Sequence, residues 1–339
     1  MAPLRLVFLG SDTIALPLLD WLAGEGRAWA KIVGVFTQPD RPVGRGQRIA
    51  ANGIKTWALA QGLPVFQPEK LTDDVRAQLA ALSPDVSLVM AYGHILREAF
   101  IATPRLGTLN LHTSLLPKYR GASPIQTAIA NGERETGVTL MRIVRELDAG
   151  PLADAERAAI EPLDTALTVE AKLSATCVPL MARSLPRLVD GTLAFTPQNH
   201  GDATFCRRLE KADGVLDFAA PAGVLAARIN GLYPWPTCSI ELTGQLVKPG
   251  GADVAENLGE GHVLRDIPSE PGRVVGSDPE GLLIETGRGV LRLRLLQRPG
   301  GRMLPAAEFL RGFPVARGTI VASHAMPALV GAVPFPFRR

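Results

Sequence analysis

An amide and an imidazole stand two residues apart in the run Leu109-Asn110-Leu111-His112. If this run ends a β-strand, the side chains of Asn110 and His112 point to the same face, because strand side chains alternate with period two. An amide N–H can hold an oxyanion as it develops, and an imidazole can hydrogen-bond that oxyanion or move a proton. The pair therefore points to acyl-type group transfer.

A carboxylate that could orient this imidazole occurs in Leu147-Asp148-Ala149-Gly150. Asp148 follows a strand-like run over residues 137–144, so a turn there could bring it beside His112. The residues alone leave a second interpretation open and even favour it: Asn110 satisfies backbone groups in a turn, His112 is a packed histidine, and Asp148 caps a turn.

The elements that must position these residues follow an alternating pattern in the first half of the chain. Short apolar runs alternate with helical patterns, which is typical of βαβ units that build a parallel sheet covered by helices. Strands are expected at 4–9, 31–37, 86–90, 108–111 and 137–144, and helices at 13–23, 51–61, 73–82 and 124–130. Ligands bind beyond the carboxyl ends of such strands. We therefore predict a Rossmann-like α/β fold with the site at that edge.

The second half has a different texture. A helical pattern over 165–188 precedes a polar stretch, and later short alternating runs are separated by Gly and Pro turns. That pattern predicts a smaller OB-like β-barrel. The boundaries expected from these shifts are a catalytic domain over 1–190, a linker over 191–208, the β-barrel domain over 209–321 and a tail over 322–339 without a readable element.

Composition narrows the classes of protein without identifying one. The 339 residues carry a formal net charge of +3, a weak argument for a nucleic-acid partner. No apolar run approaches the roughly 20 residues of a spanning helix, and the first residues lack the pattern of a signal peptide, so we expect a cytoplasmic location. Cys177, Cys206 and Cys238 are too widely spaced to suggest a zinc site or a disulfide framework, which predicts buried thiols and no metal.

Arginines cluster in two places. Arg41, Arg45 and Arg48 share one short loop, whereas Arg292, Arg294, Arg298 and Arg302 lie in a stretch without acidic residues. Such clusters are usually solvated faces, so they carry weight only where other motifs supply a context.

Several blocks supply that context. Asn110-Leu111-His112, Ser114-Leu115-Leu116-Pro117-Lys118-Tyr119-Arg120-Gly121 and Asp148-Ala149-Gly150 occur in order, and together they make the chain resemble the formyltransferases that use 10-formyltetrahydrofolate. The resemblance covers nearly the whole chain. It implies that Asn110 binds the formyl oxygen, while His112 and Asp148 help to deprotonate the attacking amine and stabilise the tetrahedral intermediate.

The same resemblance implies how the formyl donor is held. Ser114, Leu115, Leu116 and Pro117 match the family's folate-binding block, and Tyr92 and Gly93 match a segment near the pterin. From the residues alone, Pro117 and Gly93 could equally well only shape turns.

Other blocks concern the acceptor. Residues 36–46, 230–236 and 244–248 are similar to members of the family that formylate methionine carried on initiator tRNA. This implies initiator methionyl-tRNA as partner, with the phosphates bound by arginines of the two clusters: Arg41, Arg45, Arg48, Arg292, Arg294 and Arg298. Two segments depart from the family's pattern, since Ile14 replaces an aromatic residue and the approach to Asp148 over 143–147 is altered.

Three alternatives remain open at this level. A formyltransferase acting on a sugar-nucleotide or another small amine could share the catalytic blocks, but the basic loop and the second-half blocks argue against it. A noncatalytic RNA-binding protein is disfavoured by the intact set of Asn110, His112 and Asp148. A hydrolase that releases formate from the folate would differ in needing no acceptor amine.

Overall fold

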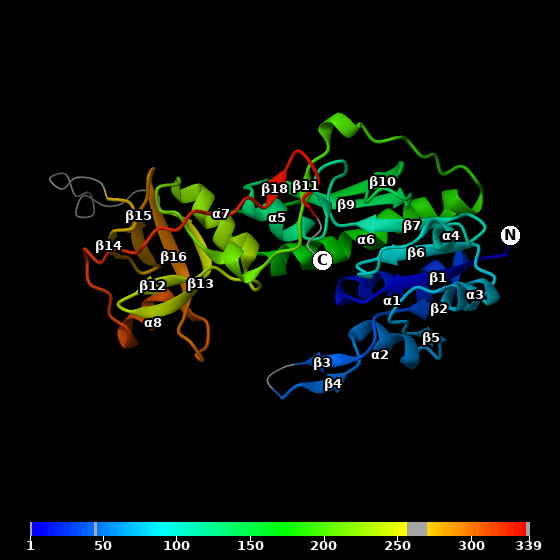
Figure 1. Ribbon diagram of the computed structural model, residues 1–339, viewed down its shortest axis with the longest axis horizontal. Helices are drawn as coiled ribbons and strands as arrows, with labels where there is room; N and C mark the ends of the chain where they lie inside the picture. Colours follow the sequence, from blue (N-terminus) through cyan, green and yellow to red (C-terminus); the bar gives the residue numbers. More distant parts are fainter. Residues whose placement is uncertain (1, 44–45, 256–269, 337–339) are drawn as a thin grey trace. The chain divides into compact units, whose positions relative to one another are not determined.

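The computed structural model describes residues 2–43, 46–255 and 270–336 (Figure 1). Contacts divide the chain into two units, each built from three segments. Unit 1 comprises Met1–Arg120, Gly137–Ala158 and Glu170–Ala203, and unit 2 comprises Gly121–Thr136, Ala159–Val169 and Thr204–Arg339. These units are not the domains expected from the sequence, whose boundaries at residues 190, 208 and 321 remain predictions.

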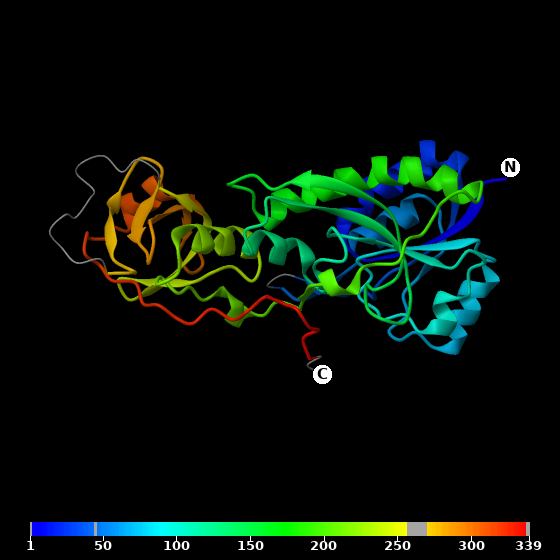
Figure 2. The same ribbon diagram turned by 90° about the horizontal axis from the view of Figure 1, so that it is seen from above.

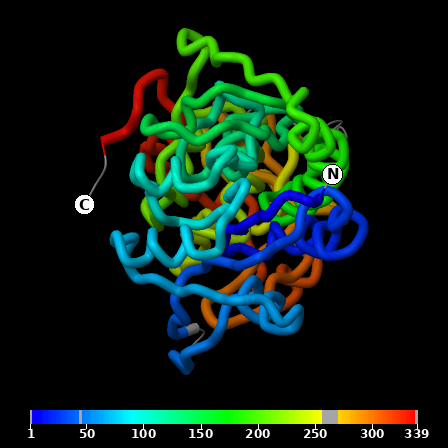
Figure 3. The backbone as a smooth tube through the Cα atoms, turned by 90° about the vertical axis from the view of Figure 1, so that its right-hand side faces the viewer, coloured from blue at the N-terminus to red at the C-terminus, as the bar shows by residue number. Residues whose placement is uncertain are grey.

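A seven-stranded sheet forms the centre of unit 1, in the order β10-β9-β7-β6-β1-β2-β5. Its strands are β1 (Leu4–Gly10), β2 (Ala30–Phe36), β5 (Val65–Phe66), β6 (Val86–Met90), β7 (Thr108–His112), β9 (Glu135–Arg142) and β10 (Leu152–Ala159). The pairs β1–β2, β1–β6, β6–β7 and β2–β5 are parallel. All five residues of β6 are buried, as expected for a parallel strand covered on both faces. The predicted Rossmann-like α/β fold is confirmed; Figure 3 shows this unit from its side, with dark blue β1 well inside the sheet.

One strand runs against the expected direction. β9 pairs with β7 in antiparallel fashion, with Leu109 opposite Arg142 and His112 opposite Thr139. The expectation that the run 137–144 ends at the carboxyl edge of the parallel strands was therefore wrong, since β9 ends at the opposite edge. Residues 143–150 form a loop after β9. The Arg142 N–H donates to the Pro151 carbonyl over 3.0 Å and so joins the two ends of this loop.

Helices cover the sheet where the apolar periodicity predicted them. Unit 1 contains η1 (Thr13–Ala15), α1 (Leu16–Ala23), η2 (Glu25–Ala28), α2 (Gly53–Ala60), α3 (Asp73–Ala81), α4 (Glu98–Ile101), η3 (His200–Asp202) and, from Glu170 onward, α6 (Ala166–Val189). Leu79 of α3 and Phe100 of α4 pack with Val7 and Leu9 of β1. Figure 2 shows α1 and α6 on the other face of the sheet. Among the described residues no helix combines the length and apolarity needed to cross a membrane.

The basic loop of unit 1 is a hairpin of β3 (Arg41–Val43) and β4 (Arg48–Ala50), paired antiparallel with Arg41 opposite Ala50. It stands away from the sheet (Figure 1). Hydrogen bonds fix its base: the Asn52 amide donates to the Thr37 hydroxyl over 2.9 Å, and Lys55 pairs with Asp40 at 2.6 Å. The hairpin therefore projects from an ordered root.

Unit 2 is an antiparallel β structure with helices against it, as the sequence predicted. Its six-stranded sheet has the order β12-β13-β16-β15-β14, with β17 added to β16. The elements are α5 (Pro124–Ala130), η4 (Lys211–Gly214), α7 (Ala222–Leu232), β12 (Ile240–Leu242), β13 (Gln245–Val254), β14 (Val274–Ser277), β15 (Leu282–Glu285), β16 (Val290–Gln297), β17 (Leu304–Pro305) and α8 (Ala306–Gly312). Leu225 and Ile229 of α7 share a buried core with Leu291 and Leu293 of β16.

Short elements complete the chain. β8 (Arg120–Gly121) lies where the chain leaves unit 1, and β11 (Phe205–Cys206) pairs antiparallel with β18 (Val330–Gly331) inside unit 2. The tail, in which the sequence shows no readable element, contains β18, and this strand of two residues is too short for a periodic pattern. The prediction of buried thiols is confirmed, since Cys177, Cys206 and Cys238 are all buried.

Candidate active site

Strand β7 presents the amide and the imidazole together. Asn110 lies between Val89 of β6 and Met141 of β9, and His112 is two residues further along the same strand. Both side chains therefore point to one face. His112 is only 6% exposed, whereas Asn110 is half-buried and its amide has no hydrogen bond to any described residue. The Asn110 amide is thus available to a ligand.

The hydrogen bonds of His112 fix which ring nitrogen carries a proton. Its Nε2 lies 3.0 Å from the Tyr119 carbonyl oxygen, which can only accept, so Nε2 is the donor. The lone pair of the neutral ring is then on Nδ1. Nδ1 lies 3.8 Å from Oδ1 of Asp148. A proton taken up by His112 therefore arrives beside a carboxylate that stabilises the imidazolium.

Asp148 reaches this position through a tightly folded turn. Its backbone is left-handed, with φ of 50°, a conformation that few non-glycine residues adopt. Gly150 approaches β9 so closely that a Cβ there would meet the Arg142 carbonyl oxygen at 1.9 Å. A glycine is therefore required at this position, and the return loop is pressed against the sheet.

Two buried polar side chains hold the backbone of this turn. The Gln198 amide nitrogen donates to the carbonyls of Asp148 and Gly150, over 2.8 and 2.7 Å. The Gln198 carbonyl accepts from Nε and Nη2 of Arg120, over 3.2 and 2.6 Å. Arg120 is 4% exposed and Gln198 6%. Burial lowers the pKa of the Arg120 guanidinium, and the charge of Asp148 opposes that fall.

Sequence reasoning missed both of these residues as parts of the site. Arg120 appeared only within the Ser114–Gly121 block, and Gln198 stood in a polar stretch interpreted as a linker. The one available signal was Pro197 beside Gln198, which is equally frequent in solvated turns.

The loop after β7 has its own internal bonds. The Ser114 hydroxyl donates to the Lys118 carbonyl over 2.7 Å, and the Thr139 hydroxyl donates to the Ser114 carbonyl over 2.6 Å. The Leu116 N–H donates to the same Thr139 hydroxyl over 3.2 Å, and the Leu116-Pro117 peptide bond is cis. The Ser114 side chain therefore supports the shape of this loop.

The segment after β6 contains buried polar atoms without partners. The Tyr92 carbonyl accepts from the Ser11 hydroxyl and the Gln38 amide, over 3.3 and 3.2 Å. The Tyr92 hydroxyl and His94 Nε2 are buried and, within the described residues, have no hydrogen-bond partner. Burial also raises the pKa of Tyr92. Because an unsatisfied buried polar group costs about 1–3 kcal/mol, these atoms suit a ligand that offers donors and acceptors.

Two arginines of the hairpin are accessible. Arg41 and Arg48 are both exposed, and Arg41 Nη2 donates to the Gln38 side chain over 2.9 Å. Arg45, the third predicted tRNA contact in this loop, lies outside the described residues.

The second arginine cluster is not a uniform basic face. Arg292 is 8% exposed and pairs with Asp253 at 3.1 Å and with Glu280. Arg294 pairs with the same two carboxylates, at 2.8 and 3.3 Å. Their charges are compensated within the sheet of unit 2, although the local sequence contains no acid. Arg298 is exposed.

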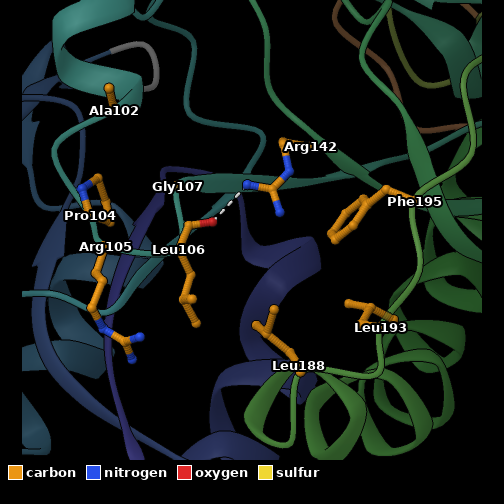
Figure 4. A pocket seen from close by; sticks show the side chains of 10 residues that line it. Ala102, Pro104, Arg105, Leu106, Gly107, Arg142, Leu188, Leu193 and Phe195 are labelled. Carbon is orange, nitrogen blue, oxygen red and sulfur yellow. Dashed lines mark hydrogen bonds between the residues drawn. The ribbon is translucent and has the colours of Figure 1, made fainter.

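A pocket of about 530 Å³ lies elsewhere in unit 1 (Figure 4). The Arg142 guanidinium stands 4.4 Å from the centre of the Phe195 ring there and donates to the Leu106 carbonyl over 2.8 Å. Gly107, in its wall, directly precedes β7. The pocket is therefore at the amino end of β7, opposite to His112, and its lining does not include the trio of Asn110, His112 and Asp148.

Comparison with known proteins gives matches over both parts of the chain. The family described as Formyl transferase matches residues 4–185, and Formyl transferase, C-terminal domain, matches residues 208–314. A methionyl-tRNA formyltransferase of Burkholderia multivorans is 40% identical over 325 residues, covering 93% of this chain and 96% of that protein. One from Pseudomonas syringae pv. syringae is 39% identical over 303 residues, covering 89% of this chain and 92% of its own.

Solved structures share the fold at low sequence identity. An N-formyltransferase from Helicobacter canadensis, in complex with folinic acid and dTDP-3-aminofucose, has a TM-score of 0.61 and 17% identity, covering 86% of this chain and 98% of that one. HypX from Aquifex aeolicus has a TM-score of 0.60 and 18% identity, covering 93% of this chain and 49% of that one.

Proposed function

Because the chain belongs to the formyl transferase family, we propose that it transfers a formyl group from 10-formyltetrahydrofolate to the amino group of methionyl initiator tRNA. The observation that carries this proposal is that His112 and Asp148 lie close together beside Asn110. The chain is also similar over nearly its whole length to methionyl-tRNA formyltransferases. Because translation begins in the cytoplasm, such an acceptor implies that the protein acts there.

The reaction joins the methionyl nitrogen to the formyl carbon and breaks the bond between that carbon and N10 of the folate. Attack places negative charge on the formyl oxygen, and the Asn110 amide is the group that donates a hydrogen bond to it. Asn110 suits this role because its amide is half-exposed and has no other bond within the described residues.

His112 and Asp148 take part in the proton transfers of the reaction. An ammonium has no lone pair, so the methionyl amine must lose a proton before it attacks. Nδ1 of His112 holds the free lone pair and faces the Asp148 carboxylate at 3.8 Å, so it accepts this proton. After attack the nitrogen gives up a second proton. One proton goes to N10 as tetrahydrofolate leaves, and the other returns to solvent.

The donor is held by the two segments that flank β7 at its carboxyl end. Leu115, Leu116 and Pro117 offer apolar surface in a loop that Ser114 and Thr139 brace from within. Tyr92, Gly93 and the unpartnered polar atoms after β6 offer hydrogen bonds to a flat heterocycle. The folate supplies the activated formyl group, and the protein supplies its orientation.

The tRNA is bound through its phosphates. The hairpin of β3 and β4 supplies Arg41 and Arg48, with Arg45 between them in sequence, and Arg298 adds an exposed charge on unit 2. We leave Arg292 and Arg294 out of this set, because a guanidinium that already binds two carboxylates offers little net charge to phosphate.

An acceptor comparison tests the proposal. The purified protein is given 10-formyltetrahydrofolate with methionyl initiator tRNA, with methionyl elongator tRNA, with a dTDP-linked amino sugar, or without acceptor. We expect formylation of the initiator tRNA at a rate far above that of the other three. Formylation of the sugar amine alone would identify a small-amine transferase, and formate release without an acceptor would identify a hydrolase; either result overturns the proposal.

A further inference from the structure

Gln198, which lies in the polar stretch after α6, is buried against the turn that carries Asp148. We propose that Gln198 is a positioning residue for formyl transfer, which holds Asp148 against His112 together with Arg120. This inference rests on the proposed function of the trio and adds the residue that determines its geometry.

The first observation is that one amide nitrogen binds two carbonyls of the same turn. Gln198 Nε2 lies 2.8 Å from the Asp148 carbonyl and 2.7 Å from that of Gly150. Both N–H bonds of the amide are used in this way. The backbone of Asp148 is left-handed with φ of 50°, a conformation that the surrounding structure must hold in place. Gln198 therefore supports the left-handed backbone conformation of Asp148.

The second observation concerns the other end of the same side chain. The Gln198 carbonyl accepts two bonds from Arg120, and Arg120 directly follows Tyr119. The Tyr119 carbonyl binds Nε2 of His112, and Tyr119 is itself left-handed with φ of 58°. One glutamine amide thus binds the side chain of Arg120, which follows the residue at Nε2, and the backbone of Asp148, whose carboxylate lies near Nδ1.

Only an amide fits this place. Arg120 is a donor and needs an acceptor, whereas two backbone carbonyls need a donor, and an amide side chain supplies both. Glutamate would accept from Arg120 but could not donate to the carbonyls. Methionine has a similar volume and would do neither.

The position of the turn affects catalysis because it sets the distance between His112 Nδ1 and Asp148 Oδ1. The gap of 3.8 Å between Nδ1 and Oδ1 is longer than a hydrogen bond by about 1 Å. A small displacement of the turn therefore decides whether the carboxylate can stabilise the imidazolium. Errors of about 1 Å in catalytic geometry cost about 100-fold in rate.

The test is a double-mutant cycle for turnover. Gln198→Met is compared with the wild type, and the same change is made in the Asp148→Asn background. If Gln198 acts through Asp148, Gln198→Met lowers kcat about 10- to 100-fold in the wild type and less than twofold in Asp148→Asn, with the KM values of folate and tRNA unchanged. Equal losses in both backgrounds would assign Gln198 a purely structural role and overturn the inference.

Two further variants keep the test informative. Gln198→Glu retains the acceptor for Arg120, loses the donors and places a negative charge against the two carbonyls, so it should show at least the same loss of kcat and the same dependence on Asp148, even if Gln198→Met does not fold. Full activity in folded Gln198→Glu would overturn the inference. The control is Asn199→Ala, which removes a neighbouring bond to the Gly201 N–H and should leave kcat within twofold. A loss in Asn199→Ala as large as that in Gln198→Glu would also overturn it.

The two proposals fail separately. If the wild type formylates a sugar amine and leaves methionyl-tRNA unchanged, the proposed acceptor is wrong, and the cycle is then measured with the sugar amine. If the wild type formylates none of the acceptors, both proposals are overturned.

Discussion

The substitution Gly150→Ala tests the geometry of the return loop without altering a polar group. An added Cβ would lie 1.9 Å from the Arg142 carbonyl oxygen, whereas real Cβ atoms stay beyond 3.0 Å. The turn must therefore move by about 1.1 Å, the difference between these two distances. Because the Arg142 carbonyl belongs to β9, the turn is the part that yields. Asp148 lies two residues away and moves with it.

A displacement of about 1 Å in a catalytic group costs about 100-fold in rate. This corresponds to about 2.7 kcal/mol of transition-state stabilisation. We expect kcat of Gly150→Ala to fall by about that factor, with a loss of unfolding free energy of about 1–3 kcal/mol from overpacking.

The assay is formylation of charged initiator tRNA at saturating folate, on protein whose folding has been verified by thermal melting. Gly201→Ala is the matched control, because a Cβ there meets only the Asn199 side chain, at 3.4 Å. Its rate should stay within twofold of the wild type. A folded Gly150→Ala protein with wild-type kcat would show that Asp148 tolerates a shift of its turn, against this expectation.

Three further predictions concern the hairpin, unit 2 and the cysteines. Arg41→Ala should weaken tRNA binding and reduce the slope of log K against log salt by about one, measured by binding titrations from low to high salt; an unchanged slope would exclude Arg41 as a phosphate contact. Arg292→Met should destabilise the protein by about 1–2 kcal/mol in chemical denaturation, because Asp253 and Glu280 each lose one arginine and keep Arg294, while tRNA affinity stays within twofold; the reverse pattern would restore Arg292 as a tRNA contact. Native Cys177 should resist iodoacetamide at pH 8, because burial raises its pKa to about 12 and leaves almost no thiolate, and rapid labelling of the folded protein would contradict its burial.

Much of unit 1 could be predicted because its strands and helices have strong periodicity. The run 86–90 coincides with β6 residue for residue, and the run 124–130 coincides in the same way with α5 of unit 2. Alternation also placed Asn110 and His112 on one face of β7. These features depend on local sequence, which is what a periodic pattern reports.

A periodic pattern does not reveal the direction of a strand in the sheet. The run 137–144 has the composition of a buried strand whether it runs parallel or antiparallel, so the direction of β9 and the return of Asp148 through the following loop could not be deduced. The same limit applies to charge: Arg292 and Arg294 have no acidic neighbour in sequence, yet Asp253 and Glu280 reach them from other strands or turns of unit 2.

Gln198 illustrates the limit most clearly. A polar stretch without periodicity predicts a solvated linker, because sequence does not reveal which amide will find two backbone carbonyls. The trio itself was suggested by chemistry, but its assignment depended on the resemblance, since isolated Asn, His and Asp residues are common in turns.

In the proposed mechanism, formyl transfer to methionyl-tRNA depends on the Asp148 carboxylate beside His112. The most direct measurement is the single-turnover rate of formylation of methionyl initiator tRNA by the wild type and by Asp148→Asn, both with saturating 10-formyltetrahydrofolate. We expect a fast wild-type reaction and a rate at least about 100-fold lower in Asp148→Asn, with the same thermal midpoint. A folded Asp148→Asn protein that formylates the tRNA at nearly the wild-type rate would contradict this mechanism.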